Sequence, residues 1–548
     1  MKSLPSFRYL RDLLLLACTC FLVACGGSGA EGGAVVPPSP PSVAETPACL
    51  PDATADYLTP NYYVGGAGAS DGNDGTTTSK AWATLTRALA EPGPAVIHFL
   101  PGSYGILNET AVPALRTGYL TLRPAPSAAA GSVVLTGVNI SYPGGSKTSA
   151  KLRIVGFTIK PDYDPTSNFF TFLKNVQDVE LLNNVITTNQ YSKATATPGA
   201  PAMFSGVSLD NTDGLLIKSN KITSVFIGLS IINSSNATLQ CNYIKPETGS
   251  AIQYSTNNTS GLILDNHIRG GAGILYTGDA ACLADPACLN APDGPHAHSS
   301  MVSIRSNDLT VRNNIMHGMG TTSALRTYPY NGVDASSGLA AYSNILIEGN
   351  LIYDVRNASP VQMLNAANQI VFRNNLVVGF NYNGTCPDGV IGDARHRYNN
   401  AFRVTLASGY DGSGISIANN ILVGSAYFPM TAFERNNIIW SYSTDNSPTW
   451  SATTASGTSK VITIASLGCG NHSTYFESSF FAAAPNFNFA HSQLLNLKPL
   501  LTSEAVNFGD ASTELMRALG KLDASDEFVS TVVNRTVSGD RSAGPYVP

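Results

Sequence analysis

The sequence predicts an all-β protein built as a right-handed, single-stranded parallel β-helix, which is a solenoid of stacked coils. The central chain repeats one phrase, in which a small or basic residue precedes Asn and an apolar residue follows one or two places later. Asn220 and Asn242 are 22 residues apart, and Asn242 and Asn266 are 24 apart. The chain of 548 residues is long for one compact core, yet no interior linker divides it. A fold that adds core coil by coil accounts for both facts.

The period explains what each part of the repeat does. A repeat in the low twenties holds three short strands and three turns, which make one coil of a β-solenoid. Short alternating strands, such as 214–217 and 344–347, precede the Asn phrases, and their Ile, Leu and Val residues fill the interior at alternate positions. Ile315 is one residue expected in that interior. Asn tolerates the left-handed backbone of a sharp turn, and stacked Asn side chains can bond along the axis as a ladder. The Asn series is therefore predicted to be structural.

The N-terminus is predicted to be a targeting segment. Basic residues precede an apolar run at 13–24, which is too short to span a bilayer and is typical of a signal peptide, here residues 1–24. The run ends in Leu-Val-Ala-Cys-Gly at 22–26, which resembles a bacterial lipobox. The resemblance implies cleavage before Cys25 and lipidation of that residue.

The residues after Cys25 extend this prediction. Gly27 stands at a position that, by the same resemblance, favours the outer membrane, with the protein facing the periplasm or the cell surface. Residues 25–58 then contain the lipidated Cys and a Gly- and Pro-rich tether. The lipid is expected to be the only contact with the membrane.

The cysteines and the net charge limit which bonds, metal sites and partners the sequence predicts. Six cysteines remain beyond the signal peptide and Cys25, and an even number in an oxidising compartment predicts disulfides. No Cys-x-x-Cys pair is present, which disfavours a zinc site. The formal net charge of −5 disfavours nucleic acid as a partner. The six cysteines are Cys49, Cys241, Cys282, Cys288, Cys386 and Cys469.

Several motifs resemble the pectate-lyase-like family of parallel β-helix proteins. The opening motif lies at 62–64, 68–76 and 82–85, coil motifs lie at 99–104 and 153–159, and a closing motif lies at 539–541 and 544–546. The resemblance implies one β-helix domain over 59–548, with an N-terminal cap and a C-terminal closing segment. Lyases, hydrolases, epimerases and adhesins share this fold, so the resemblance implies fold rather than reaction.

Three intervals between Asn phrases are longer than one repeat. They run from Asn266 to Asn313, from Asn313 to Asn350 and from Asn374 to Asn419. Long loops must account for part of the excess, and loops leaving a rigid scaffold are where function concentrates. The candidate catalytic residues in these intervals are His296, His298, Arg326 and Tyr328, and the candidate substrate-binding residues are Arg305, Tyr330, Arg395, His396 and Arg403.

These residue types suit β-elimination on a uronate-containing acidic polysaccharide. A lyase must neutralise the sugar carboxylate, by Ca²⁺ or Arg, and then remove the neighbouring carbon-bound proton. His296 and His298 are candidate bases, while Arg326 and Arg395 are candidate carboxylate clamps. Tyr328 or Tyr330 could protonate the leaving oxygen or stack under a sugar. The plainer interpretation of both histidines is that they are loop residues bonded to the backbone.

Two other function classes stay open. Gly-Pro-His-Ala-His at 294–298 resembles an Asp-Pro-His motif of β-helix proteins that include uronan epimerases. Gly294 and His298 depart from the two acids of that motif. A non-catalytic polysaccharide-binding, exopolysaccharide-assembly or adhesin protein is the third class.

Two short motifs are predicted to be turns. Asp-Gly-Asn-Asp-Gly at 71–75 resembles a calcium loop, but Trp82 stands where the closing Glu belongs, so a tight polar turn is favoured. Asn-Thr-Asp-Gly at 211–214 resembles a polygalacturonase motif whose partner motifs are missing. Calcium is the one cofactor that the sequence suggests, without a defined site.

Overall fold

The structure is a computed structural model, and it describes the chain from residue 59 to residue 464 with several gaps. The gaps lie at 112–115, 162–168, 188–204, 247–248, 271–299, 318–322, 328–341, 356–359, 380–399, 424, 430–431, 436 and 443–459.

Almost all of the described chain lies in three parallel β-sheets, which we name A, B and C. Sheet A has 13 strands in the order β1 (Tyr62–Val64), β2 (Ala95–Phe99), β5 (Leu120–Pro124), β8 (Thr148–Val155), β11 (Val176–Leu182), β14 (Leu216–Lys218), β17 (Thr238–Gln240), β20 (Gly261–Leu264), β23 (Leu309–Arg312), β26 (Ile345–Glu348), β29 (Ile370–Arg373), β32 (Ile415–Ala418) and β35 (Phe433–Arg435).

Sheet B also has 13 strands: β3 (Gly102–Ser103), β6 (Val133–Leu135), β9 (Thr158–Ile159), β12 (Val185–Ile186), β15 (Lys221–Thr223), β18 (Tyr243–Lys245), β21 (His267–Arg269), β24 (Ile315–His317), β27 (Leu351–Val355), β30 (Leu376–Gly379), β33 (Ile421–Val423), β36 (Ile438–Tyr442) and β37 (Lys460–Ile464).

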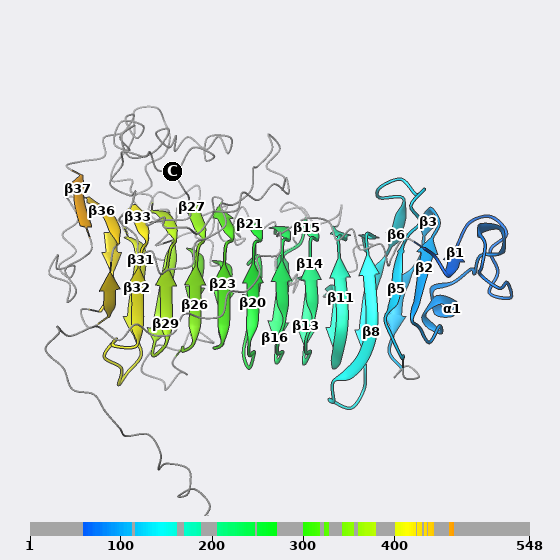
Figure 1. Cartoon of the computed structure of the whole chain (residues 1–548), viewed down its shortest axis with the longest axis horizontal. Helices are drawn as coiled ribbons and strands as arrows, with labels where there is room; N and C mark the ends of the chain where they lie inside the picture. The colour runs from blue at the N-terminus through cyan, green and yellow to red at the C-terminus, as the bar shows by residue number, and fades with distance from the viewer. Residues whose placement is uncertain are drawn as a thin grey trace, which may run out of the picture. The chain divides into compact units, whose positions relative to one another are not determined.

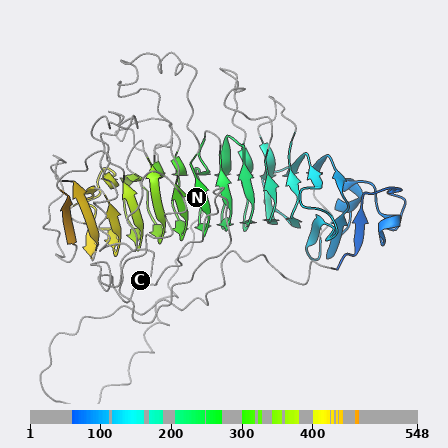
Figure 2. The same ribbon diagram turned by 90° about the horizontal axis from the view of Figure 1, so that it is seen from above.

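Sheet C has 11 strands: β4 (Ile106–Glu109), β7 (Gly137–Ser141), β10 (Phe169–Lys174), β13 (Ser205–Asp210), β16 (Ile227–Ile232), β19 (Ile252–Tyr254), β22 (Ser300–Ile304), β25 (Ser323–Thr327), β28 (Val361–Ala366), β31 (Asn400–Leu406) and β34 (Ser425–Tyr427). From β2 to β34 each coil contributes one strand to sheet A, then one to B and one to C, and the pairings between the described strands are parallel. Successive coils lie side by side in Figure 1, and Figure 2 shows the same stacking from above. The predicted right-handed parallel β-helix is confirmed.

The corner between sheets A and B has the same length in every described coil from β8 onward. It holds two residues, and from Asn184 onward the second of them is always Asn. Asn184 accepts a bond from the Phe157 N–H at 3.0 Å, and each later one of these buried side chains accepts bonds from the backbone N–H and the amide of the Asn one coil earlier, at 2.9–3.0 Å. The ladder consists of Asn184, Asn220, Asn242, Asn266, Asn314, Asn350, Asn375, Asn420 and Asn437.

The ladder refines the sequence prediction in one respect. The left-handed residue is the one before the ladder Asn, for example Ser219 (φ 57°), Cys241 (φ 58°) and Gly349 (φ 74°). Where two Asn stand together, the first takes the left-handed turn and the second enters the ladder, as in Asn313 (φ 58°) and Asn314. Turn and ladder are therefore separate roles, held by neighbouring residues.

The ladder also shows how many coils each long interval contains. Asn266 bonds directly to Asn314 although 48 residues separate them, and Asn375 bonds to Asn420 across 45. Each long interval is thus a single coil, and loops account for all of its excess length. Most of these loops leave the corner between sheets B and C, because β21 ends at Arg269 and β22 begins only at Ser300. The segment 328–341 instead joins sheet C to sheet A.

The core lies inside the coils, and one predicted interior residue is not part of it. In sheet B the inward row runs through Ile268, Met316 and Ile352, each fully buried. Ile315 is buried as predicted, at 5 % exposed, but it lies on the opposite face of sheet B and outside the main core cluster. The reason is that sheet B is apolar on both faces here, since Leu351 follows Ile315 in the outer row and is 3 % exposed. Alternation then no longer marks the inside.

A small cap closes the N-terminal end of the solenoid. It consists of β1, a 3₁₀ turn η2 (Thr78–Lys80) and the short helix α1 (Leu85–Leu89). Trp82 is fully buried and stacks on Tyr62, with ring centroids 4.4 Å apart. Thr84 caps α1 by accepting a bond from the Arg87 N–H at 3.1 Å.

The predicted targeting segment and most of the cysteines lie outside the described residues. The targeting segment lies within residues 1–58, which include Cys25. The predicted closing motif follows residue 464 and also lies outside the described residues. Cys241 is the one described member of the six cysteines, so their pairing stays a prediction. In the described part of the chain, no helix is long and apolar enough to cross a membrane.

Candidate functional site

The outer face of sheet C carries an aligned polar row. Register pairs Ser303 of β22 with Arg326 of β25, Arg326 with Gln362 of β28, and Gln362 with Arg403 of β31. Their strand neighbours point inward: Leu325, Val361, Met363 and Phe402 are all fully buried. Because successive side chains in a strand point to opposite faces, the four aligned residues face away from the core.

The strand spacing sets the geometry of this row. Adjacent strands lie about 4.8 Å apart, so the Arg326 and Arg403 backbones are about 10 Å apart with Gln362 between them. Both arginines are partly exposed, while Gln362 and Ser303 are 8 % and 4 % exposed. The row thus offers two guanidinium groups separated by an amide. A guanidinium matches a carboxylate with two parallel N–H donors, and the amide suits a hydroxyl.

Arg326 and Arg403 were predicted as loop residues, but the structure places them on strands. A strand fixes the backbone of such a residue by hydrogen bonds on both sides, so its position depends less on the adjoining loops. The prediction missed Gln362 and Ser303. Only the coil-to-coil register reveals them, because each is an ordinary polar residue at an outward position.

Six of the other candidates lie outside the described residues, but their chain neighbours are placed. His296 and His298 shortly precede β22, and Arg395 and His396 shortly precede β31, so both pairs belong to connections that enter sheet C at its amino edge. The segment with Tyr328 and Tyr330 leaves β25 directly after Thr327, at the opposite edge. All three segments are therefore tethered to strands that carry the polar row or adjoin it.

Arg305 follows β22 directly and lies in the turn from sheet C to sheet A. Burial raises the pKa of the neighbouring Tyr342 phenol to about 12, and the positive charge of Arg305 acts in the opposite direction. Arg305 is thus placed against a buried phenol at the edge of sheet C. It does not belong to the aligned row.

The two motifs predicted as turns are turns. The Asp71 carboxylate accepts bonds from Ala83 N at 2.8 Å, Thr84 N at 2.9 Å and Thr84 Oγ1 at 2.7 Å. Asp74 binds Thr76 and Lys80 instead, so the two carboxylates do not converge. Asp213 accepts bonds from Ser235 at 2.8 Å and Asn236 at 2.7 Å in the next coil.

Nowhere in the described ranges do three or more His, Cys, Asp or Glu side chains gather in a way that could hold a metal ion. Calcium accordingly stays a prediction without a donor set.

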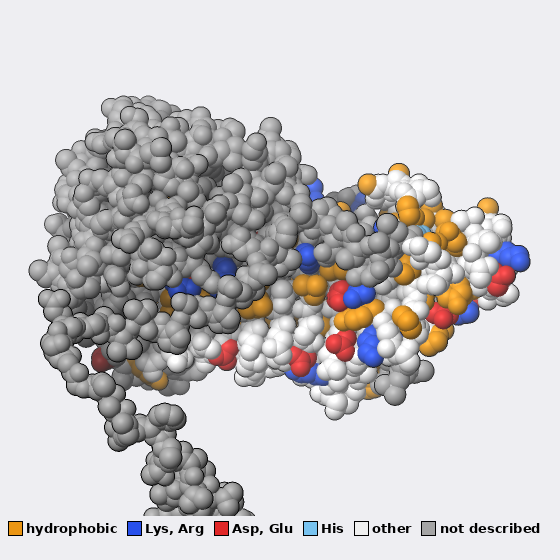
Figure 3. Space-filling view, in the orientation of Figure 1, with side chains coloured by type: hydrophobic (Ala, Val, Ile, Leu, Met, Phe, Trp, Pro, Cys, Tyr) orange, Lys and Arg blue, Asp and Glu red, His pale blue; other side chains and the backbone are white. Residues whose placement is uncertain are grey.

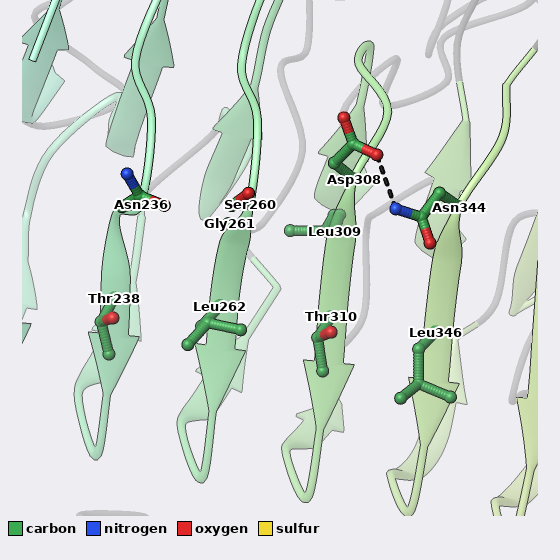
Figure 4. Close-up of a pocket in the computed structure, with 10 residues that line it drawn as sticks. All are labelled: Asn236, Thr238, Ser260, Gly261, Leu262, Asp308, Leu309, Thr310, Asn344 and Leu346. Atoms are coloured by element: carbon green, nitrogen blue, oxygen red, sulfur yellow. Dashed lines mark hydrogen bonds between the residues drawn. The ribbon is translucent and has the colours of Figure 1, made fainter. Parts of the chain in front are cut away.

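A separate surface on sheet A contrasts with the row on sheet C. It is a shallow groove of about 410 Å³ whose floor combines Leu262 and Leu346 with Thr238 and Thr310. Figure 4 shows its polar end, where Asn344 Nδ2 donates to Asp308 Oδ1 at 2.6 Å. None of the described residues that line this groove is basic. On the face shown in Figure 3, acidic and basic side chains lie near one another rather than segregated by sign.

No family model matches the chain, and no curated protein matches it by sequence. Three similar solved structures are an alginate lyase from Paenibacillus sp. str. FPU-7, a mannuronan C-5 epimerase A-module from Azotobacter vinelandii, and a surface adhesin of Streptococcus pneumoniae.

The similarity is confined to the fold. The lyase is 14 % identical over 53 % of this chain and 91 % of its own, with a TM-score of 0.34. The epimerase module is 13 % identical over 65 % and 94 %, with a TM-score of 0.38. The adhesin is 10 % identical over 65 % and 85 %, with a TM-score of 0.36.

Proposed function

We propose that the protein binds an acidic, uronate-containing polysaccharide across the outer face of sheet C and cleaves it by β-elimination. The observation that carries the proposal is the aligned row of Arg326, Gln362 and Arg403. Two guanidinium groups at a fixed separation suit a polymer that carries a carboxylate on successive sugars. The net charge of −5 makes this local basic character a property of the row and not of the whole chain.

The chemistry requires three groups. A guanidinium neutralises the sugar carboxylate and so makes the neighbouring carbon-bound hydrogen more acidic. A base removes that proton, the electron pair forms a carbon–carbon double bond, and the glycosidic carbon–oxygen bond breaks. The leaving oxygen then takes a proton. Arg326 and Arg403 are assigned to the first step on their position. His296 or His298 as base and Tyr328 as acid are assigned on their attachment to β22 and β25.

The rival function is binding without cleavage, and one observation favours it. Among the described residues, the outer row of sheet C contains no His, Lys, Asp or Glu that could exchange a proton near neutral pH. An epimerase would use the same first proton transfer and return a proton to the opposite face of the sugar.

An ultraviolet assay for unsaturated uronate, with alginate and polygalacturonate as substrates, separates these functions. Lyase activity should produce absorbance from the new double bond. His296→Ala should lower turnover by roughly 10²-fold or more with binding nearly intact. Arg326→Gln and Arg403→Gln should weaken binding as well, whereas Arg87→Gln on the N-terminal cap should change neither. Binding of a uronate polymer without absorbance, in the presence and absence of calcium, would replace the lyase with one of its two rivals.

We also propose that the protein is an outer-membrane lipoprotein anchored through Cys25. The lipobox-like sequence at 22–26 supports this. Cys25→Ser should move the protein from the membrane fraction to the soluble fraction, because one lipid anchor supplies the membrane affinity. Membrane association of that variant would contradict the proposal.

A further inference from the structure

An uncharged stripe runs along the outer face of sheet A over six successive coils. Register aligns its members from β14 to β29, and their strand neighbours, such as Val311 and Ile347, are fully buried on the inner face. Every member is at least partly exposed, and Leu262 is 37 % exposed. The stripe consists of Leu216, Thr238, Leu262, Thr310, Leu346 and Val371. Methyl groups therefore form a straight line along the solenoid.

A polar border follows the stripe on the side where the strands begin. Its residues precede four of the stripe residues by two positions, and all have left-handed φ angles of 53–56°. The repeated backbone brings each side chain out at the same place in its coil, as Figure 4 shows. The border consists of Asn236, Ser260, Asp308 and Asn344. This border and the central part of the stripe line the groove of about 410 Å³.

The border supplies hydrogen-bond acceptors and negative charge. Asn344 Nδ2 donates to Asp308 Oδ1 and holds the carboxylate in place. Among the described residues, no side chain donates to Oδ2 of Asp308, so this oxygen can accept from a ligand hydroxyl. Asn236 Nδ2 donates to Asp213 Oδ1 at 2.7 Å, so a second carboxylate adjoins the border. Since the described lining residues include no cation, the groove disfavours an anionic ligand.

The size and chemistry of the groove distinguish three uncharged or self-paired occupants. A second copy of the chain would gain little, because the stripe and border are about 24 Å long and about 10 Å wide, and their area of roughly 240 Å² is well below the roughly 800 Å² per partner of a stable interface. An acyl chain would contact the methyl groups but would not use the hydrogen-bonding groups of Asp308 and Asn344. A neutral sugar matches both, because its C–H groups pack on methyl groups and its hydroxyls bond along the edge.

We propose that this groove binds a neutral, extended glycan, which lies along the stripe with its hydroxyl groups toward the polar border. One contact per coil along a straight line suits an extended β-1,4-linked chain better than a helical α-1,4-linked chain. The site does not depend on the function proposed for sheet C, because the two faces differ in charge: arginines lie in the row on sheet C, and carboxylates lie beside the groove on sheet A. The protein thus has separate surfaces for an acidic and a neutral glycan.

Calorimetry with cellohexaose, mannohexaose and xylohexaose tests the site, with maltohexaose as the helical comparison. The wild type should bind at least one of the three extended hexaoses, and more tightly than maltohexaose. Leu262→Lys places a long charged side chain in the middle of the stripe and should weaken this binding by about tenfold or more. Ile106→Lys is the matched control, because Ile106 is 57 % exposed on β4 of sheet C, and it should bind as the wild type does.

A second variant keeps the test independent of that bulky change. Asp308→Asn retains a residue that tolerates the left-handed backbone. It should weaken the same binding several-fold, because a neutral amide oxygen is a weaker acceptor than a carboxylate.

Several outcomes would overturn the proposal. They are no binding of the three extended hexaoses at concentrations on the order of 1 mM, unchanged binding in Leu262→Lys, or loss of the binding in Arg326→Gln, which would place the neutral glycan on sheet C. Equal binding of maltohexaose would overturn the match to an extended chain. A wild-type dimer in sedimentation velocity that Leu262→Lys dissociates would assign the stripe to a second copy. Binding of polygalacturonate should be the same in Leu262→Lys and wild type, so the failure of either proposal is distinguishable from the failure of the other.

Discussion

The two corners that flank sheet B follow opposite rules. The corner from sheet A to sheet B keeps two residues in every described coil from β8 onward, and the buried Asn ladder links most of these corners. The corner from sheet B to sheet C ranges from the single residue at 136 to the long connection at 270–299. A corner whose side chains must bond the next coil cannot change length, whereas a corner without such a ladder accepts insertions. Four of the nine candidate site residues, His296, His298, Arg395 and His396, belong to connections at this variable corner.

The largest effect should come from inserting one residue into each corner. A Ser inserted between Gly349 and Asn350 displaces the ladder and shifts the strand that follows it, which exchanges inward and outward side chains. We expect a loss of at least about 5 kcal/mol or a failure to fold. A Ser inserted between Gly320 and Thr321, in the corner from B to C, should cost less than about 1 kcal/mol. Unfolding in guanidinium measures the free energy of unfolding of both insertion variants. Similar losses of stability would contradict the distinction between the two corners.

A substitution within the ladder should have the next largest effect. Asn350 Oδ1 accepts from the Asn314 backbone at 2.9 Å and from its amide at 3.0 Å. Its own amide donates to Val311, Glu348 and Asn375. Asn350→Ala leaves several buried groups without partners, at about 1–3 kcal/mol each.

We therefore expect Asn350→Ala to lose about 3 kcal/mol or more in the free energy of unfolding. Asn108→Ala is the matched control, because Asn108 is exposed on the outer face of β4. It should lose less than about 1 kcal/mol. A loss as small in Asn350→Ala would show that the stacked strands hold the corner without the ladder.

The sequence predicted the constant corner well and the variable corner poorly, for a physical reason. The Asn phrase repeats because each ladder residue must hydrogen-bond the Asn of the next coil. The repeat is therefore visible in the sequence, at Asn220, Asn242 and Asn266. The sequence does not show which residues of sheet C are aligned, because connections of unequal length separate its strands. Arg326 and Arg403 were recognised by residue type, but their alignment with Gln362 depends on that register.

The sequence also could not show which side chains of a short strand point inward. In β24 both Ile315 and Met316 are apolar and buried, so the period of two that marks a half-buried strand is missing. The sequence therefore identified the strand but not its inward residue.

An ion-pair lock beside the constant corner should give a smaller effect than the ladder. Glu348, whose side chain is 2 % exposed, pairs with Arg312 at 2.9 Å and Arg373 at 2.8 Å in the two flanking coils. Glu348→Gln should lose about 2 kcal/mol, because two guanidinium groups would then face a neutral amide. Asp210→Asn, which changes the more exposed pair with Lys174, should lose less than about 1 kcal/mol. Chemical denaturation of the two variants checks the order, and the reverse order would mean that burial does not make the Glu348 pairs more stabilising than the exposed pair.

The smallest effect should come from the N-terminal cap, where a carboxylate takes the place of the ladder amide. The Thr84 hydroxyl, together with the N–H groups of Ala83 and Thr84, holds the pKa of the Asp71 carboxyl below its usual value. The stability that Asp71 contributes is therefore complete above its unfolded pKa of about 3.9 and is lost as the pH falls through the lower folded value. Asp71→Asn should lose on the order of 1 kcal/mol at neutral pH, similar to the loss of a helix cap, and the difference from wild type should shrink in acid.

The ladder supplies the control for this pH dependence. Amide side chains do not titrate, so the difference between wild type and Asn350→Ala should stay constant over the range in which the Asp71→Asn difference shrinks. Carboxylates unaffected by either substitution titrate equally in variant and wild type, and they cancel in the difference. Denaturation at pH 7, pH 4 and pH 2.5 measures both differences. An Asp71→Asn difference that stayed level into acid would mean that hydrogen bonding, and not the charge, holds the cap turn, as it holds the corner between sheets A and B.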